Sequence, residues 1–392
     1  MKQLIIVLAF STIICFDLFS QENIEKVVTE IEKNNTTLLA LRQNTEAEKM
    51  GNKTGIYLSN PEVEFNYLWG SPSVIGNRTD FSVKQSFDFP TAYRYRQQIS
   101  TLRNEQAELD YEKQRREILM QARKVCVDLT YNNALRKELT SRMGNAAKIA
   151  ESYRAKFRLG EANILEFNKT QLVLLNLTKE METIEIEGKE LASQLALLNG
   201  GNAIEFADSE FQSLVIPDDF DQWYANAEQA NPVLQWLKQE IEVLQKQEKL
   251  NQAQSLPKLQ AGYMSEKVVG QQFQGLTVGI SIPLWENKNT VKYAQAQAEA
   301  AQSLQADQKL HFYNSLKSLY SKAAGLQKNL VDYRQKLQSC NNSQLVLKAL
   351  DKGEISMIEY MFELAVYYDS VGRLLESERD LNQTWVELNW YN

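Results

Sequence analysis

A ten-residue motif occurs twice in the chain and contains its most regularly placed acidic residues. The first copy is Arg158–Phe167 (RLGEANILEF), and the second is Asp351–Tyr360 (DKGEISMIEY), 193 residues later. The copies share Gly-Glu, a small polar residue, an aliphatic residue, Glu and an aromatic residue. The segments Asp88-Phe-Pro90 and Ser281-Ile-Pro283 recur at the same interval. The chain is therefore predicted to be one structural unit used twice.

Residue types that carry catalysis are scarce. His311 is the only histidine, and it lies on a predicted helix without other metal ligands at a suitable spacing. The sequence has no phosphate-binding glycine loop, cysteine cluster or nucleophile motif. The eight methionines are scattered, so they indicate no metal relay. We therefore expect a protein that is not an enzyme, with no cofactor and no metal site.

The first twenty residues are predicted to be a secretory signal peptide. An almost unbroken apolar run from Leu4 to Cys15 follows Met1-Lys2, and Ser20 can occupy the cleavage position. The run is too short for a typical membrane span. A membrane anchor and a lipidated Cys15 are the alternatives, although Ile14 is larger than the small residue expected before a lipidated cysteine.

Two cysteines remain after cleavage, Cys126 and Cys340. They are not equivalent in the repeat, and their predicted separation along the helices is roughly 30 Å at about 1.5 Å per residue. This distance excludes a disulfide, so both are predicted to be buried or inert thiols.

Composition favours a folded and largely helical protein. Charged residues make up 24% of the 392 residues and apolar residues 43%, and the net charge is −7. The negative charge disfavours nucleic-acid binding. Proline is absent from 91–216 and 284–392, so two long tracts lack the strongest helix breaker.

The elements can be assigned from periodicity. Alternation of period two indicates strands, and 4-3 spacing of apolar residues indicates long coiled-coil helices. In the first repeat (21–200) we predict a helix over 24–57, strands over 61–69 and 80–89, a long helix over 91–159 and a return helix over 163–199. An equatorial segment (201–221) precedes the second repeat (222–392), for which we predict a helix over 222–254, strands over 257–266 and 275–283, a long helix over 288–350 and a return helix over 354–390.

The strand pattern points to a membrane. Each predicted strand approaches the 9–11 residues that a transmembrane strand needs, and aromatic residues lie near the strand ends. Four strands cannot close a barrel, and open sheet edges are not tolerated in hydrocarbon. Copies of the chain must therefore assemble, with two copies giving eight strands and three giving twelve. The alternative is a water-soluble four-stranded sheet with one solvated face.

The signal peptide, the duplicated plan and the repeated motif resemble the TolC family of bacterial outer-membrane efflux proteins. The most specific segment is Tyr153–Gly160 (YRAKFRLG), which is followed by Leu165-Glu-Phe and Gln171. The resemblance covers essentially the whole mature chain. It implies a mostly α fold and a homotrimer in which a shared twelve-stranded transmembrane β-barrel continues as an α-helical tunnel through the periplasm. It also implies docking to a periplasmic adapter and an inner-membrane pump, which the short chain suggests is of the resistance-nodulation-division type.

The same resemblance assigns candidate site residues. Glu359, Phe362 and Glu166 map to the pore constriction, where three copies of Glu359 would form a carboxylate ring that attracts cations. Two departures from the family pattern put its usual gate chemistry in question, because Phe362 replaces an acidic residue and Ile355 replaces an arginine. The alternative for Glu359 is a solvated acid on a helix face. The residues that map to the adapter-docking tip are Leu159, Gly160, Glu161, Lys352, Gly353 and Glu354.

The predicted function is a passive export duct of a tripartite efflux system in the outer membrane, in contact with its lipid. A periplasmic adapter protein with long coiled-coil hairpins is the alternative, although an adapter would need additional small β-domains around a single hairpin. A secreted coiled-coil protein is a third possibility, and it gives no reason for four alternating strands. The sequence does not identify the exported substrate.

Overall fold

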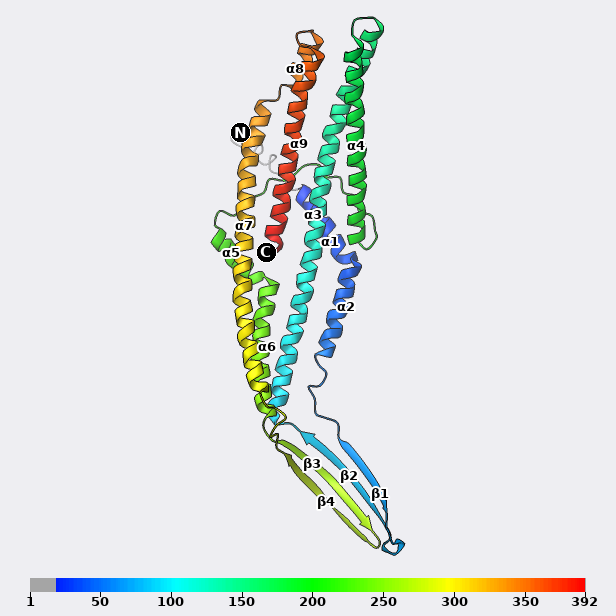
Figure 1. The fold of residues 1–392 in the computed structure, drawn as a ribbon, viewed down its shortest axis with the longest axis vertical. Coiled ribbons are helices and arrows are strands. Elements are labelled where there is room, and N and C mark those ends of the chain that lie inside the picture. Colours follow the sequence, from blue (N-terminus) through cyan, green and yellow to red (C-terminus); the bar gives the residue numbers. More distant parts are fainter. Residues whose placement is uncertain (1–18, 392) are drawn as a thin grey trace, which may run out of the picture. The chain divides into compact units, whose positions relative to one another are not determined.

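The computed structural model describes residues 19–391 (Figure 1). The predicted signal peptide lies almost entirely outside this range. The chain divides into two compact units. Unit 1 contains the residues up to Leu39, Gln114–Ala227 and the residues from Tyr313 onward, and unit 2 contains Ala40–Lys113 and Glu228–Phe312.

Unit 2 contains the sheet, which has four antiparallel strands in the order β1-β2-β3-β4. The strands are β1 (Glu62–Trp69), β2 (Asn77–Phe87), β3 (Lys258–Val268) and β4 (Gln271–Ser281). The unit also contains most of α2 (Thr36–Gly51), all of α6 (Pro232–Gln254) and the first parts of α3 (Pro90–Arg158) and α7 (Thr290–Ser339). Ala92 and Ile99 of α3 pack against Val243, Leu250 and Ala253 of α6 in its core.

The two strand hairpins have different connections. A loop containing the short 3-10 helix η1 (Ser73–Ile75) joins β1 to β2. Only Val269 and Gly270 separate β3 from β4, and Gly270 has a φ of 75°. A two-residue hairpin turn favours a positive φ, which glycine adopts without strain. The loop predicted between the strands at 257–266 and 275–283 was therefore too long, because strand pairing continues almost to the turn.

Unit 1 is built from helices. Besides the larger parts of α3 and α7, it contains α1 (Phe19–Asn34), α4 (Ile164–Leu198), most of α5 (Phe220–Ala230), α8 (Ser343–Asp351), α9 (Met357–Leu388) and the 3-10 helix η2 (Asn389–Tyr391). The long helix α3 matches the helix predicted over 91–159, which lies within the first proline-free tract. The absence of helix breakers is thus reflected directly in the structure.

Three predicted helices are interrupted. The helix predicted over 288–350 is divided at 340–342 into α7 and α8, where the Asn341 side-chain oxygen accepts hydrogen bonds from the Ser343 backbone nitrogen (3.3 Å) and hydroxyl (2.7 Å). Asparagine and serine side chains compete in this way with helical backbone bonds. The helix predicted over 222–254 is divided between α5 and α6, because Asn231 caps α6 and Pro232 occupies its first position.

The helix predicted over 24–57 is also divided, at Asn35, and its second part ends at Gly51. The Asn35 side-chain oxygen accepts a bond of 2.8 Å from the Leu38 backbone nitrogen, and its amide donates to the Leu198 carbonyl (2.7 Å). Asn35 therefore starts α2 and at the same time fastens this junction to the end of α4.

Residues 202–219 form neither helix nor strand, and they are held to the helices of unit 1 by side chains. Asn133 donates to the Asp208 carbonyl (3.0 Å), Gln327 donates to the Leu214 carbonyl (2.6 Å), and the Tyr320 hydroxyl donates to the Pro217 carbonyl (2.6 Å). Within the same segment Ile216 is buried in a cluster with Ala323, Leu330 and Leu381. The predicted fold class is confirmed, since the chain is mostly α with a small sheet and two strand–strand–long-helix repeats.

Candidate functional site: a two-faced sheet and two helix turns

The strand register gives the sheet one apolar face across all four strands. Residues that lie directly opposite in neighbouring strands point to the same side. Val63 pairs with Val83, Val83 with Tyr263, and Tyr263 with Leu276. Leu276 is 87% exposed. The apolar residues of this face are Val63, Phe65, Tyr67, Trp69, Phe81, Val83, Phe87, Leu259, Ala261, Tyr263, Leu276, Val278 and Ile280. Its polar residues are Asn77, Thr79, Gln85, Ser265, Lys267, Gln272 and Gln274, and all but Gln85 lie toward the hairpin ends of the strands.

The opposite face of the sheet is mainly polar. Arg78 forms ion pairs with Asp80 (2.8 Å) and Glu266 (3.2 Å), and Lys84 lies 3.5 Å from Glu64 across the neighbouring strand. Leu68, Met264, Val268 and Phe273 are apolar exceptions on this face. The sheet therefore has one face with mainly apolar side chains and one with mainly polar side chains, a pattern typical of transmembrane β-barrel strands.

Both edges of this sheet are open within residues 19–391. β1 pairs only with β2, and β4 pairs only with β3. The backbone groups on the outer sides of β1 and β4 therefore need partners from outside the chain if the apolar face contacts lipid.

In unit 1, the turn between α3 and α4 contains the first copy of the repeated motif. Gly160 has a φ of 76°. Its backbone nitrogen donates to the Phe157 carbonyl (3.1 Å), and the Glu161 nitrogen donates to the Lys156 carbonyl (2.8 Å). These two bonds form a Schellman motif, which ends α3. Leu159, beside the glycine, is 72% exposed.

The helix after this turn begins with a capping box. The Asn163 side chain accepts from the Glu166 backbone nitrogen (2.9 Å), and the Glu166 carboxylate accepts from the Asn163 nitrogen (3.1 Å). The predicted constriction residue Glu166 thus has a definite local role, which is to satisfy a backbone donor at the start of α4.

The turn between α8 and α9 has the same construction. Gly353 has a φ of 73°, its nitrogen donates to the Leu350 carbonyl (3.0 Å), and the Glu354 nitrogen donates to the Ala349 carbonyl (2.9 Å). Lys352 and Glu354 flank the glycine, with their charged groups 3.9 Å apart. The conserved spacing within the two motifs therefore encodes one turn geometry twice.

Glu359 closes the second capping box. Its carboxylate accepts a bond of 2.7 Å from the Ser356 backbone nitrogen, and the Ser356 hydroxyl accepts a bond of 3.2 Å from the Glu359 nitrogen. The backbone hydrogen bond from Ser356 is the main cause that lowers the pKa of Glu359 below its usual value, because it favours the ionised form. Glu359 remains exposed, so a capping role and a role toward solvent cations are compatible.

Phe362 lies one turn along α9 from Ile358 and is 68% exposed. The opposite side of α9 is buried, since Met357, Tyr360 and Leu364 pack with Leu350 of α8 and Tyr153 of α3. The structure therefore brings the second turn against the helix that precedes the first. Both groups of predicted site residues are divided between the two turns, with Glu166 at the first turn and Glu359 and Phe362 after the second. Figure 1 shows both turns at the same end of unit 1.

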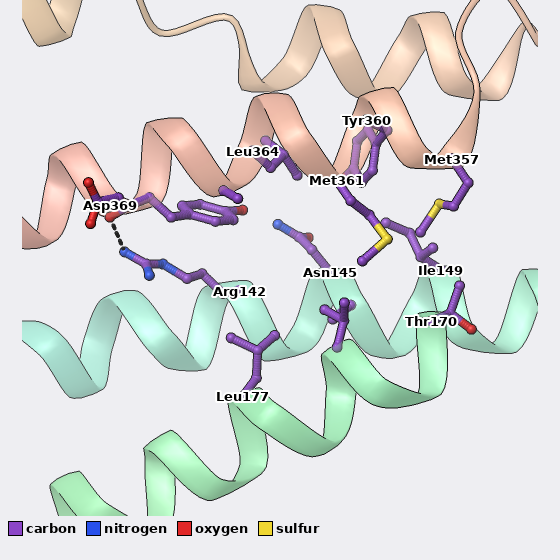
Figure 2. A pocket seen from close by; sticks show the side chains of 14 residues that line it. Arg142, Asn145, Ile149, Thr170, Leu177, Met357, Tyr360, Met361, Leu364 and Asp369 are labelled. Atoms are coloured by element: carbon purple, nitrogen blue, oxygen red, sulfur yellow. Dashed lines mark hydrogen bonds between the residues drawn. The ribbon is translucent and has the colours of Figure 1, made fainter. Parts of the chain in front are cut away.

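The structure contains a cleft that the sequence did not reveal. A cavity of about 300 Å³ lies between α3, α4 and α9 in unit 1, and most of its lining is apolar. Figure 2 shows Ile149, Leu177 and Met361 around this space, with Arg142 at one end. Helices distant in the sequence form the cleft, so no local pattern could have indicated it. We call it the α9 cleft.

The residues that could support other chemistry lie apart from these features. His311 is exposed, with its Nε2 atom 3.5 Å from Asp307. Within residues 19–391, no group of three or more His, Cys, Asp or Glu is arranged to hold a metal ion. Cys126 is buried, as predicted, and burial raises the pKa of its thiol to about 12. The prediction of a buried thiol is wrong for Cys340, which is exposed. None of the described helices combines the length and apolar character needed to cross a membrane.

Taken with the helical hairpins of unit 1, the sheet with an apolar and a polar face defines the fold of outer-membrane channels. CusC, in which conformational changes accompany folding and transmembrane channel formation, has a TM-score of 0.75 at 13% identity over 93% of this chain and 90% of CusC. The CmeC outer membrane channel of Campylobacter jejuni has a TM-score of 0.74 at 14% identity, and the match covers 94% of this chain and 85% of CmeC. The outer membrane protein VceC of Vibrio cholerae has a TM-score of 0.73 at 12% identity, and the match covers 94% of this chain and 95% of VceC.

No family profile matches the sequence, and no curated protein matches it. The resemblance to the TolC family is confirmed by the structures, at the level of the fold. At such low sequence identity, this likeness was detectable only through the duplicated plan and the turn motif, which depend on few residues.

Proposed function

We propose that this chain is one subunit of a trimeric outer-membrane channel that acts as a passive export duct. The observation that carries the proposal is the in-register apolar face of a sheet whose two edges are open. A sheet of this kind is stable in a membrane only when it closes with further strands. Three copies would supply twelve strands, and the polar face would then line the water-filled interior.

The long helices would continue this duct into the periplasm as a tunnel. Export through it would be driven by an inner-membrane pump, of the resistance-nodulation-division type in our proposal, joined to the duct by a periplasmic adapter. The likeness to channel structures over more than nine tenths of the chain supports a channel rather than an adapter. The adapter alternative is therefore not favoured.

Glu359, Phe362 and Glu166 are proposed to narrow the tunnel near the two helix turns. Three Glu359 carboxylates in a ring would favour cations over anions. The lowered pKa of Glu359 supports this role, because the carboxylate stays ionised in mildly acidic conditions. Exposed Phe362 would add an apolar constriction beside the carboxylates. Replacement of Glu359 by lysine would then shift single-channel preference away from cations.

The proposal can be tested with two neighbouring residues of β4. Leu276 lies on the apolar face and Gly275 on the polar face, and both are exposed in the single chain. In the middle of a lipid-facing strand an arginine costs about 2–4 kcal/mol. We therefore expect Leu276→Arg to abolish outer-membrane assembly, and Gly275→Arg to retain a detergent-extracted trimer that conducts ions in a planar bilayer. A soluble monomer for the native chain, or equal tolerance of both substitutions, would refute a membrane channel.

The adapter-docking tip is proposed to comprise Leu159, Gly160 and Glu161 at the first turn and Lys352, Gly353 and Glu354 at the second. Exposure of Leu159 and of the second turn supports this assignment. Gly353→Pro is expected to impair binding of the adapter in a pulldown while the trimer still forms, because proline cannot adopt a positive φ. Undiminished capture of the adapter by a correctly assembled Gly353→Pro trimer would exclude the second turn from the docking surface.

A further inference from the structure

The α9 cleft is a partly open cleft of unit 1 with a mostly apolar lining. The cleft measures about 300 Å³, which is the lower end of the range of small-molecule sites. Its walls come from three helices of one chain, with Ala146 and Ile149 on α3, Val173 and Leu177 on α4, and Met361 and Leu364 on α9.

The charged residues of the lining are already neutralised by neighbours. The Arg142 Nε atom lies 3.3 Å from the Glu138 carboxylate, and its Nη2 atom donates a bond of 3.1 Å to the Tyr368 carbonyl. Asp369 accepts a bond of 2.8 Å from Arg373. A charged ligand would lose its hydration without gaining an unpaired opposite charge, and this loss is costly in apolar surroundings. The cleft therefore favours an uncharged ligand.

The remaining lining favours aromatic rings. Met357 and Met361 contribute two thioether sulfurs, and methionine sulfur makes favourable contacts with aromatic rings. Tyr368 contributes a ring that is held in place, since the Arg142 guanidinium carbon lies 4.2 Å from its centroid. Figure 2 shows the Met361 side chain reaching from α9 toward the α3–α4 side of the cleft. The flexible methionines can adjust to a planar guest, whereas the arginine fixes one end of the site.

We propose that the α9 cleft binds an uncharged small molecule with one or two aromatic rings. Such a molecule would contact α3, α4 and α9 together and would fasten α9 to the helical hairpin formed by α3 and α4. The proposal goes beyond the export function, because binding requires neither an adapter nor a pump. It can be measured on the purified full chain, separately from conductance.

The test uses a reporter thiol and 2-naphthol as the probe. Ala146→Cys places a thiol on the cleft wall, in a background where exposed Cys340 is replaced by serine and buried Cys126 is retained. We expect saturating 2-naphthol to slow alkylation of the Ala146→Cys thiol by N-ethylmaleimide at least tenfold. The matched control is Ser339→Cys, at the equivalent position of the second repeat, which is exposed and does not line the cleft. Its alkylation rate should not change.

A second variant distinguishes binding in the cleft from partition of the probe into detergent. Val173→Phe fills the cleft from the opposite wall, so it should abolish protection of the Ala146→Cys thiol. In parallel, 2-naphthol should raise the thermal unfolding temperature of the native chain and should have no such effect on Val173→Phe. The proposal would be overturned if 2-naphthol slowed alkylation equally at both reporter positions. It would also be overturned if 2-naphthol, up to its solubility limit, neither protected the Ala146→Cys thiol nor raised the unfolding temperature of the native chain. Neither result would bear on conductance.

Discussion

The helix turn at Gly160 and the helix turn at Gly353 have the same backbone geometry, but the side chains beside them differ in burial. In the first repeat Phe157 and Phe167 stack with their ring centroids 5.4 Å apart, and Phe157 is 39% exposed. The equivalent residues of the second repeat, Leu350 and Tyr360, are buried. The turn depends on about ten consecutive residues, whereas burial depends on which helix packs against each face.

The helices that lead into these turns also differ. In the first repeat α3 runs unbroken from Pro90 to Arg158, whereas in the second repeat α7 ends at Ser339 and α8 begins only at Ser343. The first repeat has the helix-compatible residues Ala147, Lys148 and Ile149 where the second has Cys-Asn-Asn. Duplication has thus preserved the turn more strictly than the helix that leads into it.

The largest expected effect concerns the two aromatic residues of the turns. Tyr360→Ala should lower the free energy of unfolding by about 3 kcal/mol, because it leaves a cavity in a packed cluster. Phe167→Ala should cost about 1 kcal/mol, since its ring is only partly buried. Denaturant unfolding of unit 1, followed by tryptophan fluorescence and circular dichroism, would measure both. Equal losses would contradict the difference in burial between the repeats.

A smaller effect is expected from two glycines within the helices. At Gly188 an added Cβ would lie 2.7 Å from the Asn132 side-chain oxygen, and the Asn132 amide donates to the Ile184 carbonyl (2.9 Å). Gly188→Ala should therefore destabilise the protein by about 1–2 kcal/mol through overpacking.

Gly325, which is equivalent in the repeat to Asn132, provides the matched control. It lies within α7 and has open space around it. Gly325→Ala should stabilise the protein by about 0.5–1 kcal/mol through helix propensity. Denaturant unfolding compares both variants, and stabilisation by Gly188→Ala would show that Asn132 does not fix the contact between α3 and α4.

The smallest effect concerns pH and Glu359. Its pKa is lowered in the folded chain, so the stabilisation it contributes is present above its unfolded pKa of about 4.5 and is lost as the pH falls through the folded pKa. The difference in unfolding temperature between the native chain and Glu359→Gln should therefore shrink as the pH is lowered from 7 to below 4. Glu363→Gln, on the exposed side of the same helix, is the control. A pH-independent difference would argue against an ionised capping interaction.

Much of the architecture follows from local patterns. Alternation in 61–69 and 80–89 indicated strands because successive side chains of a strand point to opposite faces of the sheet, one apolar and one polar here. The spacing of Gly160 and Glu166, repeated in Gly353 and Glu359, indicated the turns because helix caps use neighbouring residues only. The interruptions at Asn35, Asn231 and Asn341 were missed, since the apolar periodicity on both sides of each asparagine continues almost without a gap.

The candidate site was less predictable than the fold. Pairing of Val83 with Tyr263 joins the two repeats, and no residue in either strand specifies that partner. The α9 cleft depends on α9 packing beside α3 and α4, so its lining comes together only in the folded chain. The roles of Glu166 and Glu359 as caps are visible in the sequence spacing, whereas their proposed role toward cations requires the positions of other copies.

Open edges on both β1 and β4 have a genetic consequence for the proposed trimer. Each copy would hydrogen-bond to two neighbours through different strands, so a copy with one unpairable edge would still bind a normal neighbour through the other. Such a copy would sequester native subunits in rings that cannot close. Alleles that damage only β1 or only β4 should therefore be dominant over the native gene, whereas alleles that prevent folding altogether should be recessive.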